Sequence, residues 1–307
     1  MPKDNTLFKR EEINRQLAGY FLSLEPGINI DSVRDLAGRL HASIGLISES
    51  ISRLEELGAI EIDRRGQLGS FLVRQSVGKL WAAAVNQPLV IAHTLPSNRR
   101  YEGLATALKK AFNAAGIEAY FIFVRGSRTR LNALRENRCH IAIVSQFAAE
   151  GLRTRAEEIA ATLSHGSFVK SHQVFFRKGT QTKMPIRVAI DPDSFDQTQL
   201  SNIEFKEKSI DFLKITFMSI HHYLSENKVD MAIWTEEDME NQMGTAISKR
   251  ALSEKTLEIV GSRNTKAALV IRANDTATHA LIQKVVDADE IDRFQQAVIS
   301  GEIIPEY

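Results

Sequence analysis

Hydrophobic residues near the beginning of the chain recur at helical spacing. Ile13, Leu17, Tyr20 and Phe21 share one face of a helix that we expect from residue 8 to residue 24. The run Glu25-Pro26-Gly27 then interrupts the pattern, because proline and glycine favour a turn. The first helix should therefore end just before this turn.

Two shorter helices and a hairpin are expected next. Asp31 or Ser32 can cap a helix whose apolar residues include Leu36. After a turn at residues 41–43, a third helix runs to Leu57, and Gly58 is placed to end it. Residues 59–63 and 69–73 alternate between apolar and polar, as strands do, around a turn at residues 64–68. Helix–turn–helix followed by a hairpin predicts a winged helix-turn-helix.

Beyond residue 88, apolar runs alternate with amphipathic stretches, which is typical of α/β domains. We expect strands at residues 89–93, 118–124, 141–144, 173–176, 186–190, 203–205, 229–234, 257–260 and 267–272. We expect helices at residues 100–114, 128–137, 153–161 and 215–227, with two more closing the chain. Because helices separate the strands, the pattern predicts parallel sheets.

The predicted fold class is thus α/β with an N-terminal winged helix-turn-helix. We expect the winged helix-turn-helix at residues 1–75, a connector at 76–87 and an α/β domain at 88–307. A length of 307 residues suits two such domains. The single cysteine, Cys139, precedes an apolar run and is expected to be a core residue, which argues against disulfides.

No apolar run in the sequence has the length of a signal-peptide core or a membrane span. We therefore expect a cytoplasmic protein with no membrane partner. The formal net charge is +1. Residues 1–80 hold 11 lysines and arginines and 11 acids, so the global charge does not favour a nucleic acid.

The local distribution of charge favours double-stranded DNA more clearly. Residues 64–79 contain four cations and no acid, which suits phosphate contacts. The first turns of the third helix would present small polar side chains to base edges in the major groove. The expected DNA-binding residues are Arg34, Ser43, Gly45, Ser48, Arg64, Arg65 and Gln67.

The first domain resembles the winged helices of GntR-type regulators. The resemblance rests on Glu25-Pro26-Gly27 and on the runs 32–37, 43–60 and 66–71, and it covers about residues 9–74. It implies DNA binding. GntR-type recognition helices usually carry arginines early, where this chain has Ile44 and Ser48. Losing such contacts would weaken or redirect DNA reading by ~1–3 kcal/mol per good bidentate contact. A three-helix unit kept for packing or dimerisation is the alternative.

In the second domain, small polar residues and arginines follow the predicted strands. Helix N-termini at such positions favour an anion, and residues 98–138 hold nine lysines and arginines against three acids. We therefore expect a small anionic ligand carrying a phosphate or a carboxylate. Helix capping is the alternative role for the serines and Asn98, and a core position is the alternative for Trp234. The expected ligand-binding residues are Ser97, Asn98, Arg100, Gly126, Ser127, Arg128, Ser145, Gln146, Ser194, Trp234 and Thr235.

The segment Arg125–Val144 is similar to part of the type II periplasmic-binding-protein fold, as found in LysR-type effector domains. Across its whole length, the chain resembles the YhfZ-type regulators. These resemblances imply that residues 88–307 form a two-lobed, solute-binding-like domain of the periplasmic-binding-protein (type II) kind. They also imply a homodimeric transcription regulator in which a ligand closes the cleft of that sensor domain.

The sequence shows no Walker loop, no nucleophile elbow and no Cys/His cluster. We therefore expect no catalytic residue, no metal site and no cofactor. The alternatives are a ligand-sensing or interaction protein that does not bind DNA, and an enzyme built on the binding-protein fold.

Overall fold

The computed structural model describes residues 3–179, 184–240 and 246–307, and the chain forms two compact units. Neither unit is one continuous stretch of sequence. The first contains Met1–Leu89, Lys109–Tyr120 and Ala273–Val286. The second contains Val90–Leu108, Phe121–Arg272 and Asp287–Tyr307.

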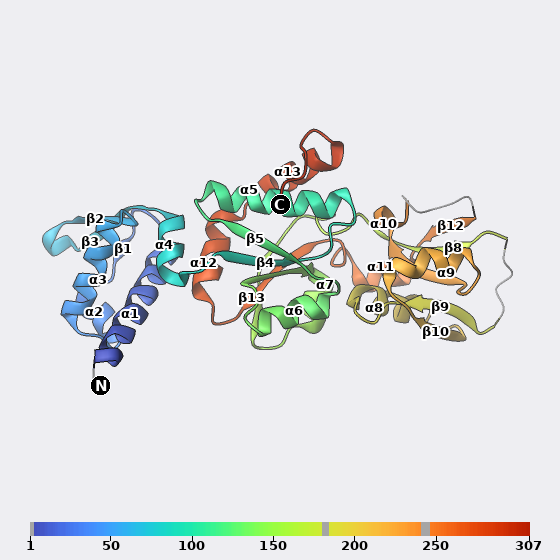
Figure 1. Ribbon diagram of the computed structural model, residues 1–307, viewed down its shortest axis with the longest axis horizontal. Coiled ribbons are helices and arrows are strands. Elements are labelled where there is room, and N and C mark those ends of the chain that lie inside the picture. Colours follow the sequence, from blue (N-terminus) through green and yellow to red (C-terminus); the bar gives the residue numbers. More distant parts are fainter. Residues whose placement is uncertain (1–2, 180–183, 241–245) are drawn as a thin grey trace. The chain divides into compact units, whose positions relative to one another are not determined.

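The first unit has the winged helix-turn-helix arrangement that the sequence predicts (Figure 1). Its three strands form an antiparallel sheet in the order β1-β3-β2. Its elements are α1 (Lys3–Ser23), β1 (Asn29–Ile30), α2 (Val33–Arg39), α3 (Ile44–Glu56), β2 (Ile60–Arg64), the short 3-10 helix η1 (Gly66–Leu68), β3 (Ser70–Gln75), α4 (Val77–Val85) and α12 (Thr276–Val285).

Local side chains fix the ends of these helices. Ser32 caps α2 by accepting a hydrogen bond from the backbone N–H of Asp35, and Ser43 caps α3 in the same way through Leu46. The apolar face of α3 is buried through Ile47, Ile51 and Leu54, at the spacing of successive helical turns. Gly58 follows α3 with a φ of 62°, a conformation that glycine adopts without strain.

Helix α12 comes from the far end of the chain but packs within the first unit. It contacts α1 and α4. Lys284 of α12 donates from Nζ to the backbone oxygen of Leu24 at 2.7 Å and to Glu25 Oε1 at 2.6 Å. The support of the winged helix-turn-helix therefore includes residues from both ends of the sequence.

The second unit contains two lobes, each with a five-stranded sheet. The first sheet has the order β5-β4-β6-β13-β7, with β4 parallel to β6 and β13 antiparallel to both β6 and β7. Helix α5 lies on one side of this sheet and α6 on the other (Figure 1). The elements are β4 (Leu89–His93), α5 (Arg99–Ala114), β5 (Ala119–Phe123), α6 (Ser127–Arg135), β6 (Ile141–Ser145), α7 (Gln146–Leu152), β7 (Glu157–Thr162), β13 (Ala267–Arg272) and α13 (Ala288–Ser300). Three of them begin or end in the first unit, which includes Leu89 of β4, residues 109–114 of α5 and residues 119–120 of β5.

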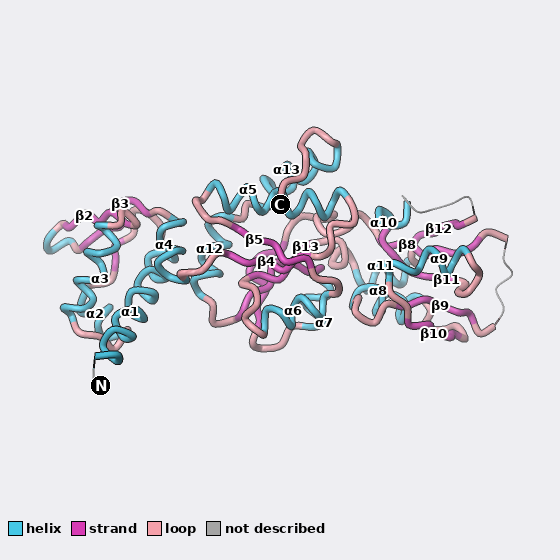
Figure 2. The backbone as a smooth tube through the Cα atoms, in the orientation of Figure 1, coloured by secondary structure: helices cyan, strands magenta, loops and turns pink. Residues whose placement is uncertain are grey.

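The second lobe repeats this plan with the strand order β10-β9-β11-β8-β12. Strand β9 is parallel to β10 and β11, whereas β8 is antiparallel to β11 and β12. The tube in Figure 2 shows these strands and the helices beside them. The elements are β8 (His172–Arg177), β9 (Ile186–Ile190), α8 (Phe195–Glu204), β10 (Ile210–Lys214), the 3-10 helix η2 (Phe217–Ser219), α9 (Ile220–Ser225), β11 (Met231–Thr235), α10 (Glu236–Glu240), β12 (Ile247–Ala251) and α11 (Glu254–Val260).

Several expectations from the sequence are wrong in this region. Both sheets are mixed rather than parallel, because β13 and β8 run against their neighbours. In place of the helix expected at residues 153–161, residues 153–156 form a turn and residues 157–161 lie in strand β7. The strands expected at residues 203–205 and 257–260 are the C-terminal ends of α8 and α11. Short apolar runs do not distinguish a buried strand from a buried helix, and these runs were too short to decide.

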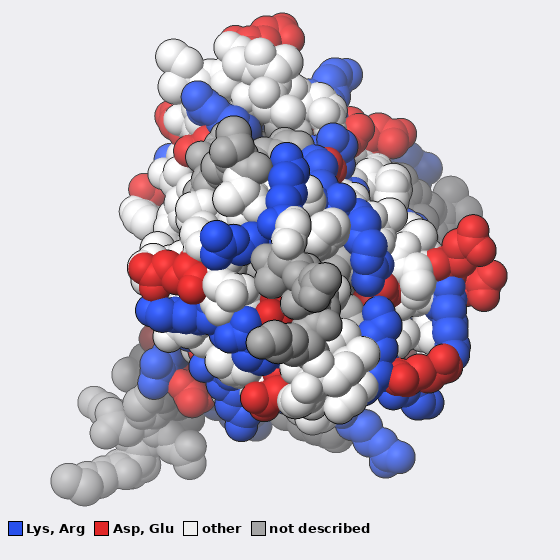
Figure 3. Space-filling model, turned by 90° about the vertical axis from the view of Figure 1, so that its right-hand side faces the viewer, with Lys and Arg blue, Asp and Glu red and all other residues white. Residues whose placement is uncertain are grey.

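Charged side chains of both signs cover the outer face of the second lobe (Figure 3). Three ion pairs of this lobe join Arg187 to Asp230 at 2.7 Å, Lys228 to Glu226 at 2.6 Å and Lys255 to Glu207 at 2.6 Å. Cys139 is buried, as expected, and burial raises its pKa to about 11. None of the helices in the described ranges combines the length and hydrophobicity that crossing a bilayer requires.

Candidate functional site

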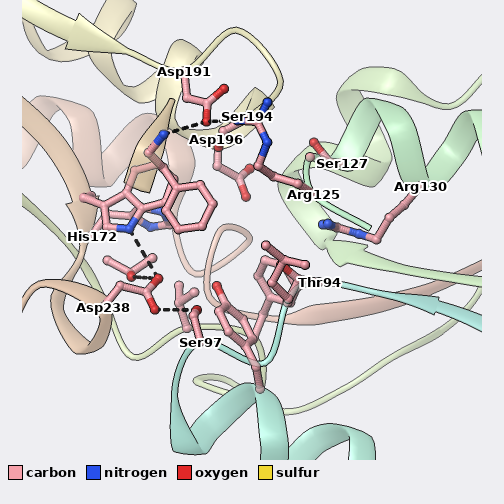
Figure 4. Close-up of a pocket in the computed structure, with 18 residues that line it drawn as sticks. Thr94, Ser97, Arg125, Ser127, Arg130, His172, Asp191, Ser194, Asp196 and Asp238 are labelled. Atoms are coloured by element: carbon pink, nitrogen blue, oxygen red, sulfur yellow. Dashed lines mark hydrogen bonds and ion pairs between the residues drawn. The ribbon is translucent and has the colours of Figure 1, made fainter. Parts of the chain in front are cut away.

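A cavity of about 70 Å³ lies between the two lobes of the second unit (Figure 4). It is placed where strands β4, β5, β9 and β11 end, as is usual for ligand sites in α/β folds. The first lobe contributes Thr94, Leu95, Ser97, Tyr101, Arg125, Gly126, Ser127 and Arg130. The second lobe contributes His172, Asp191, Ser194, Asp196, Phe217, Trp234, Thr235 and Asp238, and Phe168 and Val169 complete the lining.

Arg125 is neutralised within the cavity wall. Its Nη1 donates to Asp191 Oδ2 at 2.6 Å, and its guanidinium also pairs with Asp193. Asp191 is buried and accepts a second hydrogen bond, from the backbone N–H of Phe217, at 2.9 Å. This arginine therefore joins the first lobe to the second and has its charge balanced inside the protein.

Arg130 lies in the same wall without a counter-ion. It is only 3% exposed, and its Nε and Nη1 donate to the backbone oxygens of Ile143 and Val124 at 2.7 and 2.9 Å. Within the described residues, no carboxylate forms an ion pair with it. Burial lowers its pKa, but only to about 10, so the guanidinium is charged at neutral pH. Figure 4 shows it extending from α6 toward the cavity. A buried charge of this kind needs an anion beside it.

Asp196 is a buried carboxyl with few donors. It is 7% exposed, and Oδ1 accepts a hydrogen bond from Ser145 Oγ at 2.8 Å. Burial raises its pKa to about 7, against the opposing effects of Ser145 and Arg130. This carboxyl therefore changes its protonation state near neutral pH.

Asp238 is, by contrast, well satisfied. Its Oδ1 accepts from Ser97 Oγ at 2.7 Å and from Asn98 Nδ2 at 2.8 Å. Its Oδ2 accepts from Thr235 Oγ1 at 2.6 Å and from Trp234 Nε1 at 3.3 Å. Asp238 thus draws together donors from both lobes.

Apolar and neutral groups form the rest of the second-lobe wall. The rings of Phe217 and Trp234 stack with centroids 5.0 Å apart. Asn264 Nδ2 lies 2.9 Å from His172 Nδ1, and burial lowers the pKa of His172 to about 4. His172 is therefore neutral at physiological pH and adds no charge to the cavity.

The first unit presents the candidate DNA-binding surface. Gly45 and Ser48 are exposed on α3, as is Arg34 in the first turn of α2. Ile44 is 52% exposed at the start of α3. Ser43 is also exposed, but its hydroxyl accepts the capping hydrogen bond of α3. Polar side chains and one apolar side chain are therefore available at the start of this helix.

The wing arginines are paired with acids. Both Nη atoms of Arg64 donate to Glu55, at 2.9 and 2.5 Å. Arg65 pairs with Asp63 at 2.7 Å, and Arg74 pairs with Glu61 at 2.9 Å. The run of cations at residues 64–79 is thus largely neutralised by acids that precede it in the sequence. Gln67 is exposed at the tip of the wing.

Comparison with known proteins assigns the family. A family model described as the YhfZ C-terminal domain matches residues 77–307, and a helix-turn-helix domain model matches residues 26–72. The chain belongs to the YhfZ family. It is 30% identical to YhfZ of Escherichia coli strain K12 over 306 residues, which cover 98% of this chain and 99% of that protein. The chain therefore joins a helix-turn-helix domain to a YhfZ C-terminal domain, the architecture of a regulator.

Solved structures support the family and the fold. The crystal structure of YhfZ from Shigella flexneri matches with a TM-score of 0.62 and 28% identity, covering 74% of this chain and 96% of that one. The periplasmic aliphatic sulphonate binding protein SsuA of Escherichia coli matches with a TM-score of 0.50 and 12% identity, covering 70% and 75%. The second likeness shows that the YhfZ C-terminal domain has a periplasmic-binding-protein-like fold.

In this YhfZ-family chain, the expected ligand residues divide into two groups. Asn98 and Arg100 bind acids of α10, Ser145 caps α7 and donates to Asp196, and Gln146 donates to Glu150. The guanidinium of Arg128 lies over the ring of Phe195, 5.9 Å from its centroid. None of these five residues lines the cavity. The expected residues that do line it are Ser97, Gly126, Ser127, Ser194, Trp234 and Thr235.

Sequence reasoning missed the charged residues that dominate the cavity, namely Arg125, Arg130, Asp191, Asp196 and Asp238. One of them left a signal. Arg130 is buried together with Ser127, Leu131 and Leu134 on one stripe of α6. A charged residue on the apolar face of a helix must be paired or functional, and this pattern could have singled out Arg130 instead of Arg128. Within the described residues, no cluster of three His, Cys, Asp or Glu side chains is arranged to hold a metal.

Proposed function

We propose that this YhfZ-family protein is a transcription regulator that works in the cytoplasm as a homodimer. Residues 1–75 would bind double-stranded DNA, residues 76–87 would connect the domains, and residues 88–307 would bind a small anionic ligand between the lobes. The protein would act by binding rather than by catalysis. The observation that carries the ligand proposal is Arg130, a buried guanidinium at the cavity without a carboxylate partner among the described residues.

Three donors accompany Arg130 in the first-lobe wall. Ser127 opens α6, and its Oγ accepts from the backbone N–H of Phe195 at 3.4 Å, which leaves the hydroxyl proton available. The hydroxyls of Thr94 and Tyr101 line the same cavity. A phosphate or carboxylate would accept hydrogen bonds from these groups, and charge-assisted hydrogen bonds to arginine are the strongest of this type.

The DNA proposal rests on the helix-turn-helix domain and on the exposed first turns of α2 and α3. In a homodimer, two recognition helices would read half-sites about 34–36 Å apart. Ligand binding would change the preferred arrangement of the dimer, with a coupling free energy of about 1–3 kcal/mol, which is typical for such proteins.

DNA binding is tested by fluorescence anisotropy with the DNA that flanks the protein's own gene, at two salt concentrations. Arg34→Ala should weaken binding, and it should reduce the salt dependence by about one released counter-ion. Arg138→Ala removes a similar exposed charge from the second unit and should leave binding unchanged. Binding no tighter than to unrelated DNA of the same length would contradict the proposal.

A second candidate function is ligand sensing without DNA binding. The pairing of Arg64, Arg65 and Arg74 with acids favours it, because these charges are already balanced within the protein. In that case the winged helix would serve as a protein interaction module, and the anisotropy experiment would detect no sequence-specific complex.

A further inference from the structure

The charges around the cavity are distributed unequally between the lobes. On the first-lobe side, Arg125 has acid partners, whereas Arg130 has none among the described residues. On the second-lobe side, Asp191 pairs with Arg125, and Asp238 accepts hydrogen bonds from four side chains. Asp196 accepts one hydrogen bond, from Ser145. Among the described residues, the cavity therefore has one cation without an ion-pair partner and one carboxyl that accepts a single hydrogen bond.

Both groups are buried and belong to opposite lobes. Arg130 is 3% exposed on α6 of the first lobe, and Asp196 is 7% exposed on α8 of the second. Figure 4 shows both side chains at the cavity. They form no ion pair with each other at hydrogen-bond distance. A ligand between them can therefore contact both.

We infer that the ligand is a small amino acid whose carboxylate binds Arg130 and whose ammonium group binds Asp196. This inference rests on the proposed anion site and names its ligand class. An amino acid supplies the negative charge that Arg130 lacks and the donors that Asp196 lacks. A simple anion would satisfy Arg130 alone and would give Asp196 no donor in addition to Ser145. Contact with both residues also holds the lobes together, because each lobe contributes one end of the site.

The volume and lining of the cavity limit the rest of the ligand. The cavity of about 70 Å³ suits a small side chain better than a large one. The stacked rings of Phe217 and Trp234 offer that side chain an apolar surface.

The inference is tested on the full chain by thermal shift and isothermal titration calorimetry at pH 8. The probes are the individual L- and D-amino acids of the protein alphabet, glycine and β-alanine. Each amino acid that stabilises the protein is then compared with its deaminated carboxylic acid and with its amide. We expect at least one small amino acid to bind, and its deaminated acid and its amide to bind about tenfold more weakly or worse, since each lacks one charge-assisted contact.

Two near-isosteric variants assign the ends of the ligand. Asp196→Asn should weaken amino acid binding about tenfold without weakening binding of the deaminated acid, because a neutral side chain no longer repels its carboxylate. Arg130→Gln should weaken binding of both compounds. Asp211→Asn and Arg138→Gln change exposed residues of the same types and should bind like the parent protein. If Arg130→Gln does not fold, Tyr101→Phe serves in its place. This variant removes one hydrogen-bond donor from the same wall and should weaken binding of both compounds severalfold.

The outcomes separate this inference from the proposed function. Equal binding of the amino acid and its deaminated acid would overturn the amino acid inference but leave an anion site at Arg130. Stabilisation by inorganic phosphate or acetate but by no amino acid would have the same meaning. Binding that is unaffected by both Asp196→Asn and Arg130→Gln would place the ligand elsewhere and overturn the inference, as would the absence of binding by any probe.

Discussion

Arg100 Nε of the first lobe donates to Glu237 Oε1 of the second lobe at 2.6 Å, and both side chains are largely buried, at 12% and 18% exposure. The same carboxylate oxygen accepts the backbone N–H of Lys170 at 3.0 Å. Arg100 also donates from Nη1 to the backbone oxygen of Gly166 at 2.6 Å. The contact between the lobes is therefore made partly by charged groups that do not line the cavity.

Replacing Glu237 with glutamine should loosen this contact. Arg100 would lose its counter-ion, and we expect a loss of about 1–3 kcal/mol in the free energy of unfolding. Hydrogen exchange at the Lys170 amide should become severalfold faster. Glu207→Gln is a suitable control, because the pair between Glu207 and Lys255 is well exposed and should contribute little. Equal exchange at Lys170 in the parent protein and in Glu237→Gln would show that this pair does not hold the lobes.

Gly126 should not tolerate a side chain. A Cβ at this position would lie 2.7 Å from the backbone oxygen of Asp193 in the other lobe, and its φ is +83°. Gly179 has a similar φ of +70°, and no atom of the described residues lies within 4 Å of the added carbon. Both alanine variants should lose about 1 kcal/mol through backbone strain, and Gly126→Ala should lose about 1–3 kcal/mol more through the clash. Urea unfolding measures both, and equal losses would contradict a close approach of the lobes at Gly126.

Freeing Arg64 should strengthen DNA binding. Glu55 binds both Nη atoms of Arg64, so Glu55→Gln makes this guanidinium available to a phosphate. We expect tighter binding and a salt dependence steeper by about one counter-ion. Glu56→Gln, on the same helix, makes the same change in net charge without touching that pair. If the two variants bind DNA equally well, the effect comes from net charge and not from Arg64.

Asp196 should make the stability depend on pH. Its pKa is about 7 in the folded protein and near 3.8 in the unfolded chain, so the folded protein binds the proton more tightly. Its contribution to stability is therefore fully present below about pH 4 and is lost as the pH rises to about 7. Between pH 5 and pH 8, Asp196→Asn should gain on the order of 2 kcal/mol relative to the parent protein.

Urea unfolding of both proteins across this pH range measures the difference. His93 and His172 act in the opposite direction, because burial lowers the pKa of each to about 4 and their contribution is lost as the pH falls. Both histidines are present in both proteins, so their effect cancels in the difference. For the control Asp211→Asn, the difference in unfolding free energy from the parent protein should not change with pH. If the difference for Asp196→Asn is equally independent of pH, Asp196 is ionised throughout this range.

The sequence predicted the positions of cavity residues that follow strands. Ser97, Ser127 and Ser194 were found because a small polar residue after an apolar strand marks the carboxyl edge of a sheet. Arg130 lies further along its helix, so strand ends gave no information about it. Arg128 and Arg130 are two residues apart, which turns them to nearly opposite sides of α6, and only the buried stripe distinguishes them.

Pairing partners could not be predicted from local sequence. The cations at residues 64–79 looked free because their acids, such as Glu55, lie outside that stretch. Strand β12 was missed because Ile247-Ser-Lys-Arg-Ala lacks a clear apolar pattern, and it forms by pairing with β8. Contacts between distant parts of the chain decide both cases.

The position of α12 has a consequence for how the protein is made. Helix α12 follows β13 in the sequence, yet it packs against α1. Its Lys284 donates a hydrogen bond to the backbone oxygen of Leu24, the residue that follows α1. A ribosome that has synthesised only the winged helix-turn-helix has not yet delivered this helix. Helices α1 and α4 therefore complete their packing only after nearly the whole chain has been translated. A fragment that ends at residue 75 would lack α12 and would expose the surface of α1 that α12 covers.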